Sequence, residues 1–277
     1  MPMQKKLNKR EIRKFRKAIW DYYRTHGRHK LPWRKTKNPY RILVSEIMLQ
    51  QTQVDRVIPK YKQFIKTFPS ISSLGKASLA EIIAVWQGLG YNRRAVSLYK
   101  TAGILNNQYR GRVPSSPDVL KNLPGIGEYT ASAIAAFAYN KPVLLIETNI
   151  RTVYIHFFLS RKKMVHDSEI KALLEQTVDN GQIREWYYAL MDYGAMLKKI
   201  HRDLNTRSVH YSRQSRFEGS TRQVRGRIIS LLLENGPAGK QKIRNSVELS
   251  DHNLDEILDK LRHDGLIAKN GSLYIIA

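Results

Sequence analysis

The sequence predicts an all-α main domain followed by a small winged-helix domain of α+β structure. Apolar residues recur at helical spacing from residue 9 to residue 197, and no strand-like alternation occurs before residue 265. The last segment, 223–277, shows three short helical patterns and then a hairpin signal. A chain of 277 residues is long enough for one large core and one accessory domain.

The charge balance indicates a polyanionic partner, of which nucleic acid is the leading candidate. Lys and Arg number 48 against 23 Asp and Glu, which gives a formal net charge of +25. The hydrophobic content of 42% is ordinary for a globular protein, so the chain is not a disordered basic tail. An anionic membrane surface or ribosome-like packing would also attract such a charge.

The chain has no cysteine and no metal-site pattern of histidines, which limits the kinds of reaction it can catalyse. The absence of cysteine excludes disulfides, thiolate zinc sites, thiol nucleophiles and cysteine-ligated iron–sulfur clusters. The histidines form no metal-site pattern, since His26 and His29 lie in a basic turn, so we expect no metal and no cofactor. The chain shows neither an apolar run of roughly 20 residues nor a signal-peptide core, so we expect no membrane contact and a cytoplasmic location.

Helix signals follow one another through the first part of the chain. Residues 9–26 form an amphipathic pattern, and the run after Pro39, "YRILVSEIMLQQTQV", is apolar nearly all round, which predicts a buried helix. Pro59 should end or kink the next helix. In "SLAEIIAVW", Ser78 and Glu81 predict a capping box at a helix start.

The second half of the main domain continues the helical pattern. Ser116 and the proline after it start "SPDVLKNL" as a helix N-terminus prefers, and "YTASAIAAFAY" is a small-residue helix suited to close packing. We expect further helices at about 148–160, 167–179 and 182–197. The polar and strongly basic residues 198–222 should form an extended connector, either along a phosphate backbone or as a solvated linker.

The final segment has the winged-helix order, with a hairpin that should turn at Asn270-Gly271. Its third helix carries more acidic than basic side chains: Asp251, Asp255, Glu256 and Asp259 against Lys260, Arg262 and His263. We therefore do not expect this helix to enter a major groove. Two alternatives are docking on the main domain and DNA contact through Lys240, Lys242, Arg244 and Lys269.

The segment "LPGIGEYTASAI", residues 123–134, predicts a helix-hairpin-helix motif. Its tight turn is formed by Leu123, Gly125, Ile126 and Gly127 with the intervening proline. Glycines let the backbone turn sharply and present N–H groups at a helix N-terminus to an anion. In a strongly basic helical protein, we expect that anion to be a DNA phosphate, contacted without reading the base sequence. A purely structural helical corner would use similar glycines.

Two carboxylates stand in apolar settings, Glu46 in "LVSEIMLQQT" and Glu147 in "VLLIETNIRTV". Such a pair is typical of an acid and an electrostatic partner, and burial would raise the pKa of Glu46 and make it a proton donor. The alternative for each is a buried acid paired with one of the many arginines.

The chain resembles the helix-hairpin-helix base-excision DNA glycosylases, most closely the MutY-type adenine glycosylases. The resemblance covers about residues 10–197 and rests on blocks that occur in family order: "LPWRKTKNPYRILVSEIMLQQTQVDRVIPKY", "WQGLGYNRRA", "LPGIGEYTASAIAAFAYNKP", "IETNIRTV" and "MDYGAM". It implies two helical subdomains that hold DNA and flip a nucleotide into a pocket. The first would be a six-helix subdomain at about 28–145. The second would combine the N-terminal helix with 146–197.

The resemblance also implies roles for single residues. Glu46 matches the acid that protonates the departing adenine, and Glu147 the carboxylate that stabilises the cationic sugar, with Asn149 as its polar partner. Gln51 and Tyr91 match residues that wedge into the DNA stack.

Three further positions, Leu31, Trp33 and Arg34, fall in the block that helps to line the base pocket. Tyr129 stands where bifunctional relatives that resemble endonuclease III carry a lysine. Tyrosine cannot form the Schiff base that strand cleavage needs, so base release without lyase activity is implied.

The chain departs from the family pattern in three respects. Family members usually carry aspartate where Glu147 stands, and one extra methylene could move the carboxylate by about an ångström. The basic connector replaces the four cysteines of cluster-bearing members, and we expect it to supply the DNA contacts of the cluster loop. We expect the winged-helix segment in place of a Nudix-like domain.

We expect a monomeric DNA repair glycosylase that acts on double-stranded DNA, releases adenine mispaired with 8-oxoguanine or guanine, and associates with the nucleoid. One alternative is a thymine or uracil mismatch glycosylase acting opposite guanine. Others are a non-catalytic DNA-structure binder and a winged-helix transcription regulator.

Overall fold

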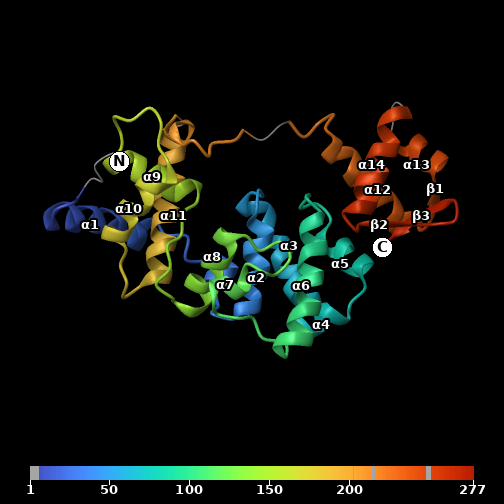
Figure 1. Ribbon diagram of the computed structural model, residues 1–277, viewed down its shortest axis with the longest axis horizontal. Helices are drawn as coiled ribbons and strands as arrows, with labels where there is room; N and C mark the ends of the chain where they lie inside the picture. The colour runs from blue at the N-terminus through green and yellow to red at the C-terminus, as the bar shows by residue number, and fades with distance from the viewer. Residues whose placement is uncertain (1–5, 202, 214–215, 248–250) are drawn as a thin grey trace. The chain divides into compact units, whose positions relative to one another are not determined.

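The computed structural model describes residues 6–201, 203–213, 216–247 and 251–277, and it is mainly helical (Figure 1). In chain order, the first helices are α1 (Lys9–His26), η1 (Pro32–Lys35), α2 (Pro39–Leu49), α3 (Val54–Thr67), α4 (Ile71–Lys76), α5 (Leu79–Trp86), α6 (Arg93–Tyr109) and α7 (Pro117–Leu120). They are followed by α8 (Glu128–Tyr139), α9 (Thr148–Phe158), α10 (Asp167–Thr177), α11 (Ile183–Ile200) and η2 (Leu204–Arg207). The expected all-α main domain is confirmed.

Helix starts follow the local signals in the sequence. The capping box of Ser78 and Glu81 opens α5 as predicted, and Asn8 with Glu11 forms a second one at the start of α1. Pro59 does not end its helix, because α3 continues through it to Thr67. A proline inside a helix removes one backbone hydrogen bond, and the kink expected here stays a prediction.

The chain forms two compact units. Unit 1 comprises Met1–Ile42, Ser115–Lys121 and Gly127–Arg213, and unit 2 comprises Leu43–Pro114, Asn122–Ile126 and Gln214–Ala277. The sequence-based subdomain boundaries stay predictions.

Each unit has its own aromatic core. In unit 1, Phe15 of α1 packs edge-on against Trp186 of α11, with ring centroids 5.9 Å apart. In unit 2, Phe64 and Trp86 make a similar contact at 5.9 Å, and both side chains are fully buried. Burial of these large rings is a main source of stability for each unit.

The C-terminal part contains the predicted three helices and hairpin. Its elements are α12 (Thr221–Asn235), β1 (Ala238–Gly239), α13 (Lys240–Val247), α14 (Asp251–His263), β2 (Ile267–Asn270) and β3 (Leu273–Ile276). The antiparallel sheet has the order β1-β3-β2. The sequence analysis did not predict strand β1, because two residues are too few to show the alternation of apolar and polar side chains that indicates a strand. The turn is also one residue later than predicted, since Asn270 pairs with Leu273 and leaves Gly271 and Ser272 in the loop.

The expected extended connector is partly helical. Helix α11 continues to Ile200, η2 forms a short turn, and α12 begins at Thr221. Val165 also forms an isolated parallel bridge with Ser208. The buried side chain of Leu204 explains why this basic segment folds against unit 1.

None of the helices in the described ranges is long and apolar enough to cross a membrane.

Candidate active site

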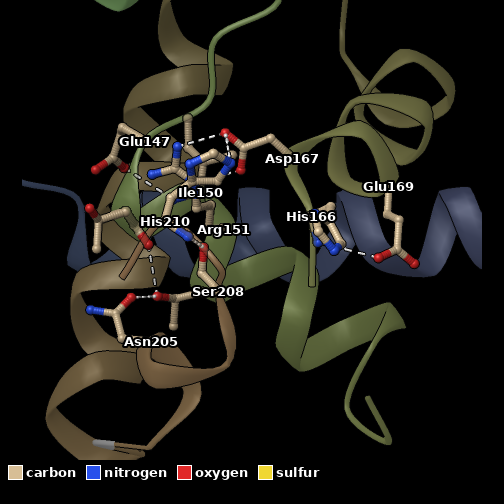
Figure 2. Close-up of polar contacts among 11 residues, drawn as sticks. Glu147, Ile150, Arg151, His166, Asp167, Glu169, Asn205, Ser208 and His210 are labelled. Carbon is tan, nitrogen blue, oxygen red and sulfur yellow. Dashed lines mark hydrogen bonds and ion pairs between the residues drawn. The ribbon is translucent and has the colours of Figure 1, made fainter. Parts of the chain in front are cut away.

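Glu147 is the N-cap of α9, and two hydrogen bonds fix its carboxylate. One oxygen accepts the backbone N–H of Ile150 at 3.0 Å, and the other accepts the side-chain amide of Asn149, also at 3.0 Å. The first of these bonds is drawn in Figure 2. The helix N-terminus also favours a negative charge at this position. The structure therefore brings Glu147 and Asn149 together as the sequence predicted.

Burial raises the pKa of Glu147, although several neighbours oppose the shift. The backbone N–H groups of Asn149 and Ile150, the positive charge of Lys198 and the Asn149 amide all favour the ionised form. Desolvation outweighs these contributions, so the pKa of Glu147 lies above its ordinary value. The residue retains intermediate exposure, while the carboxylate itself is surrounded by protein atoms.

Helix α11 supports this carboxylate from its own buried face. A Cβ on Gly194 would lie 2.2 Å from the carbonyl oxygen of Asn149, so only glycine lets α9 begin this close. Lys198 follows one helical turn later on the same face. The glycine belongs to the "MDYGAM" block, but its contact with Asn149 could not be predicted from that block.

Tyr187 of α11 binds the backbone of the segment before Glu147. The Tyr187 hydroxyl donates to the carbonyl of Val143 at 2.6 Å and accepts the N–H of Leu145 at 3.1 Å. Burial raises the pKa of Tyr187, so the hydroxyl keeps its proton.

The predicted base-pocket residues are largely buried in unit 1. Leu31 and Trp33 are 9% and 4% exposed. The Arg34 guanidinium binds both carboxylate oxygens of Asp192, at 2.6 and 2.9 Å, and lies 4.3 Å from the ring centroid of Tyr188. A second arginine, Arg28, also contacts the Asp192 carboxylate, at 2.6 Å. Arg34 therefore has a structural contact, and its part in a base pocket stays a prediction.

Asp192 remains ionised in this buried setting. Burial alone would raise the pKa of Asp192, but the bonds from Arg34 and the charge of Arg28 outweigh burial and hold it below its ordinary value. Removal of either partner would leave a buried charge with less compensation.

Glu46 lies in the buried run of α2 that its apolar neighbours predicted. Residues 42–48 are all buried, and Glu46 itself is 6% exposed. Glu46 belongs to unit 2 and Glu147 to unit 1, so each carboxylate is described in its own unit.

The two predicted wedge residues share an uncommon backbone conformation. Gln51 has φ of +53° and Tyr91 has φ of +49°, both in the left-handed region that side chains other than glycine rarely adopt. Such strain persists only where the surrounding structure holds it, and it is frequent at functional sites.

Arg94 donates hydrogen bonds to the two loops that contain Gln51 and Tyr91. The sequence analysis did not identify it as a functional residue. Its guanidinium donates to the carbonyls of Ile47 and Met48, at 2.9 and 2.8 Å, and so satisfies the last turn of α2. Further bonds reach the carbonyls of Gln50, Gly90 and Tyr91 and the hydroxyl of Thr52. Burial lowers the pKa of Arg94 to about 10. The only sequence signal was its place in "GYNRRA".

The helix-hairpin-helix turn has the predicted form. Leu123 and Ile126 are buried at 4% each, whereas Gly125 and Gly127 are exposed. Gly125 has φ of +75°, and a Cβ there would lie 2.6 Å from the Cβ of Ser97. Gly127 is the N-cap of α8, so its N–H and those after it are available to an anion. Tyr129 follows in the first turn of α8 with intermediate exposure.

The segment after α11, up to His210, is attached to α9 and α10 by polar contacts (Figure 2). Asn205 accepts the hydroxyl of Thr152 at 2.9 Å. Asp167 makes a bidentate pair with Arg151, at 2.7 Å for each bond, and lies 3.6 Å from His210. The chain has no cysteine, so no cysteine-ligated iron–sulfur cluster can form here.

Comparisons with known proteins agree with this arrangement. Residues 44–179 match the model of the family described as "HhH-GPD superfamily base excision DNA repair protein". The adenine DNA glycosylase of Buchnera aphidicola subsp. Baizongia pistaciae is 40% identical over 187 residues, which is 66% of this chain and 52% of that protein. This chain thus spans about half the length of that relative.

A mycobacterial relative and a solved structure extend the match. The adenine DNA glycosylase of Mycolicibacterium smegmatis is 34% identical over 262 residues, covering 87% of this chain and 89% of that protein. The structure of a thermostable thymine-DNA glycosylase superposes with a TM-score of 0.61 at 28% identity, covering 68% of this chain and 87% of that one. The chain therefore belongs to the HhH-GPD superfamily of base excision DNA repair proteins, and within it resembles the adenine DNA glycosylases.

Proposed function

We propose that this protein is a monofunctional DNA glycosylase of base excision repair that releases adenine mispaired with 8-oxoguanine or guanine. The observation that carries the proposal is the oriented carboxylate of Glu147, fixed by Asn149 and the start of α9. The two adenine glycosylase relatives, at 40% and 34% identity, support the choice of base.

The chemistry follows from the bond that breaks. Cleavage of the N-glycosidic bond leaves a cationic sugar and a poor leaving group, so one acid must donate a proton while one carboxylate stays ionised. Glu46 would protonate a purine ring nitrogen, and Glu147 would stabilise the sugar cation until water adds to it. No cofactor enters this reaction, and one chain is enough for one lesion.

A thymine or uracil glycosylase acting opposite guanine is the second candidate. The structural match to a thymine-DNA glycosylase supports it. Glutamate where adenine glycosylases usually have aspartate weakens the preference for adenine. A non-catalytic DNA binder is less well supported, because binding alone would not need an oriented carboxylate at the start of α9.

Single-turnover base release would decide between these functions. We would compare duplexes with adenine opposite 8-oxoguanine, adenine opposite guanine, thymine opposite guanine and uracil opposite guanine. Alkali should be required to reveal strand breaks, because Tyr129 cannot form a Schiff base. Release of adenine supports the proposal, release of only thymine or uracil supports the second candidate, and binding without any release contradicts both.

A further inference from the structure

The loop before α6 holds Tyr91 in a strained position. Gly88 and Gly90 have φ of +87° and +72°, and Tyr91 continues the left-handed stretch at +49°. Arg94 fixes the backbone by donating to the carbonyls of Gly90 and Tyr91. These bonds leave the direction of the Tyr91 side chain to be set by other contacts.

The side chain of Tyr91 is contacted by an arginine of the C-terminal domain, 131 residues away in the chain. Arg222, in the first turn of α12, donates from Nη1 to the Tyr91 hydroxyl at 2.6 Å. Its guanidinium carbon also lies 5.3 Å from the centroid of the Tyr91 ring, and that of Arg94 lies 5.5 Å away. Cations from α6 and α12 thus both contact this ring.

Other contacts attach α12 to the same region of unit 2. Asp264, just after α14, binds Arg225 of α12 at 2.5 Å and lies 3.6 Å from Arg93 of α6. Ser230 of α12 donates to the side chain of Gln87 at 3.3 Å. The position of Arg222 is therefore set by the packing of the C-terminal domain rather than by one flexible side chain.

We propose that the winged-helix domain takes part in lesion recognition, with Arg222 as a positioning residue that presets Tyr91 for insertion into the DNA stack. The inference rests on the proposed function, since Tyr91 acts as a wedge only in a base-flipping enzyme. Fixing an aromatic side chain before binding lowers the entropy cost of its insertion. A guanidinium beside the wedge also suits a polyanionic partner.

The alternative is an autoinhibitory contact, in which the C-terminal domain keeps Tyr91 from reaching DNA. That domain would then have to move away from Tyr91 before DNA binds, and the contacts of Asp264 and Ser230 oppose such a movement. A preset wedge keeps the contacts of Asp264 and Ser230, and only the Arg222 side chain has to move from the Tyr91 hydroxyl as the ring enters the stack.

The test compares Arg222→Leu with Arg227→Leu in the full chain. Both substitutions remove one charge from α12, but Arg227 is exposed. The readouts are the affinity ratio between lesion-containing and undamaged duplexes, and the fluorescence of 2-aminopurine beside the lesion, which reports unstacking. Arg222→Leu should lower the ratio about tenfold and reduce the fluorescence, since one ordered side chain contributes on that scale. Arg227→Leu should weaken binding to both duplexes equally.

A double-mutant cycle separates positioning from a general folding effect. Tyr91→Phe removes only the hydroxyl acceptor, so its effect on the affinity ratio should not add to that of Arg222→Leu. Arg222→Lys, which keeps a donor and a charge, should restore part of the ratio. Equal effects of the two leucine variants, additive effects in the cycle, or higher lesion affinity in Arg222→Leu would overturn the proposal.

The outcome is separable from that of the proposed function. Unstacking and affinity are measured without base release, so a wild-type protein that unstacks the duplex but releases no base contradicts only the glycosylase proposal. A wild-type protein that releases base without unstacking contradicts only the role of the wedge.

Discussion

Glu147 combines two tasks that its position on α9 makes compatible. As the N-cap it satisfies the N–H of Ile150, and as a carboxylate it is held in one orientation by Asn149. Aspartate, asparagine and serine are the usual caps, and the longer glutamate side chain still reaches the N–H three residues on. The residue that departs from the family pattern therefore retains both the charge and the cap.

The pH dependence of base release should report on Glu147. Because burial raises its pKa, the rate should fall as pH decreases through a value above 4.5, the ordinary pKa of glutamate. Lys198→Met removes a charge that favours the ionised form, so the acid limb should move to higher pH. Single-turnover rates from pH 4 to pH 8 check this. An acid limb unchanged in Lys198→Met would contradict the assignment.

Arg94 should be difficult to replace even by lysine. A lysine cannot satisfy acceptors in two loops and the end of α2, and unsatisfied buried groups cost about 1–3 kcal/mol each. Arg94→Lys should lower the free energy of unfolding by about that amount and weaken lesion binding. Denaturant unfolding beside the exposed Arg93→Lys control provides the measurement. Equal stability of the two variants would show that the loops do not depend on Arg94.

At the scale of elements, α11 supports the carboxylate in three ways. Its Gly194 allows the close approach of α9, its Tyr187 fixes the segment before Glu147, and the charge of its Lys198 favours the ionised form of Glu147. A change on this helix can therefore alter the site without touching DNA.

Gly194→Ala should displace the start of α9. The added Cβ would lie 2.2 Å from a carbonyl oxygen, so the helices must separate, at a typical cost of about 1–3 kcal/mol. Base release should fall together with stability. Gly103→Ala in α6 is the matched control, since its Cβ meets nothing within 4 Å, and it should stabilise the protein by about 0.4–1 kcal/mol. Similar stabilities in the two variants would contradict the close-packing account.

The helix-hairpin-helix turn contains a second matched pair of glycines, Gly125 and Gly127. Gly125→Ala introduces a side chain at φ of +75° and against Ser97, whereas a Cβ on Gly127 meets nothing within 4 Å of protein. Gly125→Ala should weaken binding to undamaged DNA at least as much as Gly127→Ala, and it alone should lower the melting temperature. Calorimetry and fluorescence anisotropy would measure the two effects. A higher melting temperature in Gly125→Ala would refute the strained turn.

For the whole molecule, the features that could be predicted from the sequence are those that depend on residues close together in the chain. The span of α1, the capping box at Ser78 and the hairpin glycines depend on neighbours within a few residues, and all three were found. The resemblance supplied the pairing of Glu147 with Asn149.

Contacts between distant residues could not be predicted in the same way. Arg94 with Ile47, Gly194 with Asn149, and Arg222 with Tyr91 are separated by tens of residues or more, and nothing in one sequence specifies such pairings. Arg34 shows the same limit, because a residue expected near the base is bound to Asp192.

The measurement that tests the account most directly is single-turnover release of adenine opposite 8-oxoguanine by wild type, Glu147→Asp and Glu147→Gln. Aspartate keeps the charge and the cap, so Glu147→Asp should lose less than the roughly hundredfold that a displacement of one ångström can cost. Glutamine keeps the length but loses the charge, and Glu147→Gln should lose at least about a hundredfold. Equal rates for Glu147→Gln and wild type, or adenine that none of the three proteins releases, would contradict the central claim.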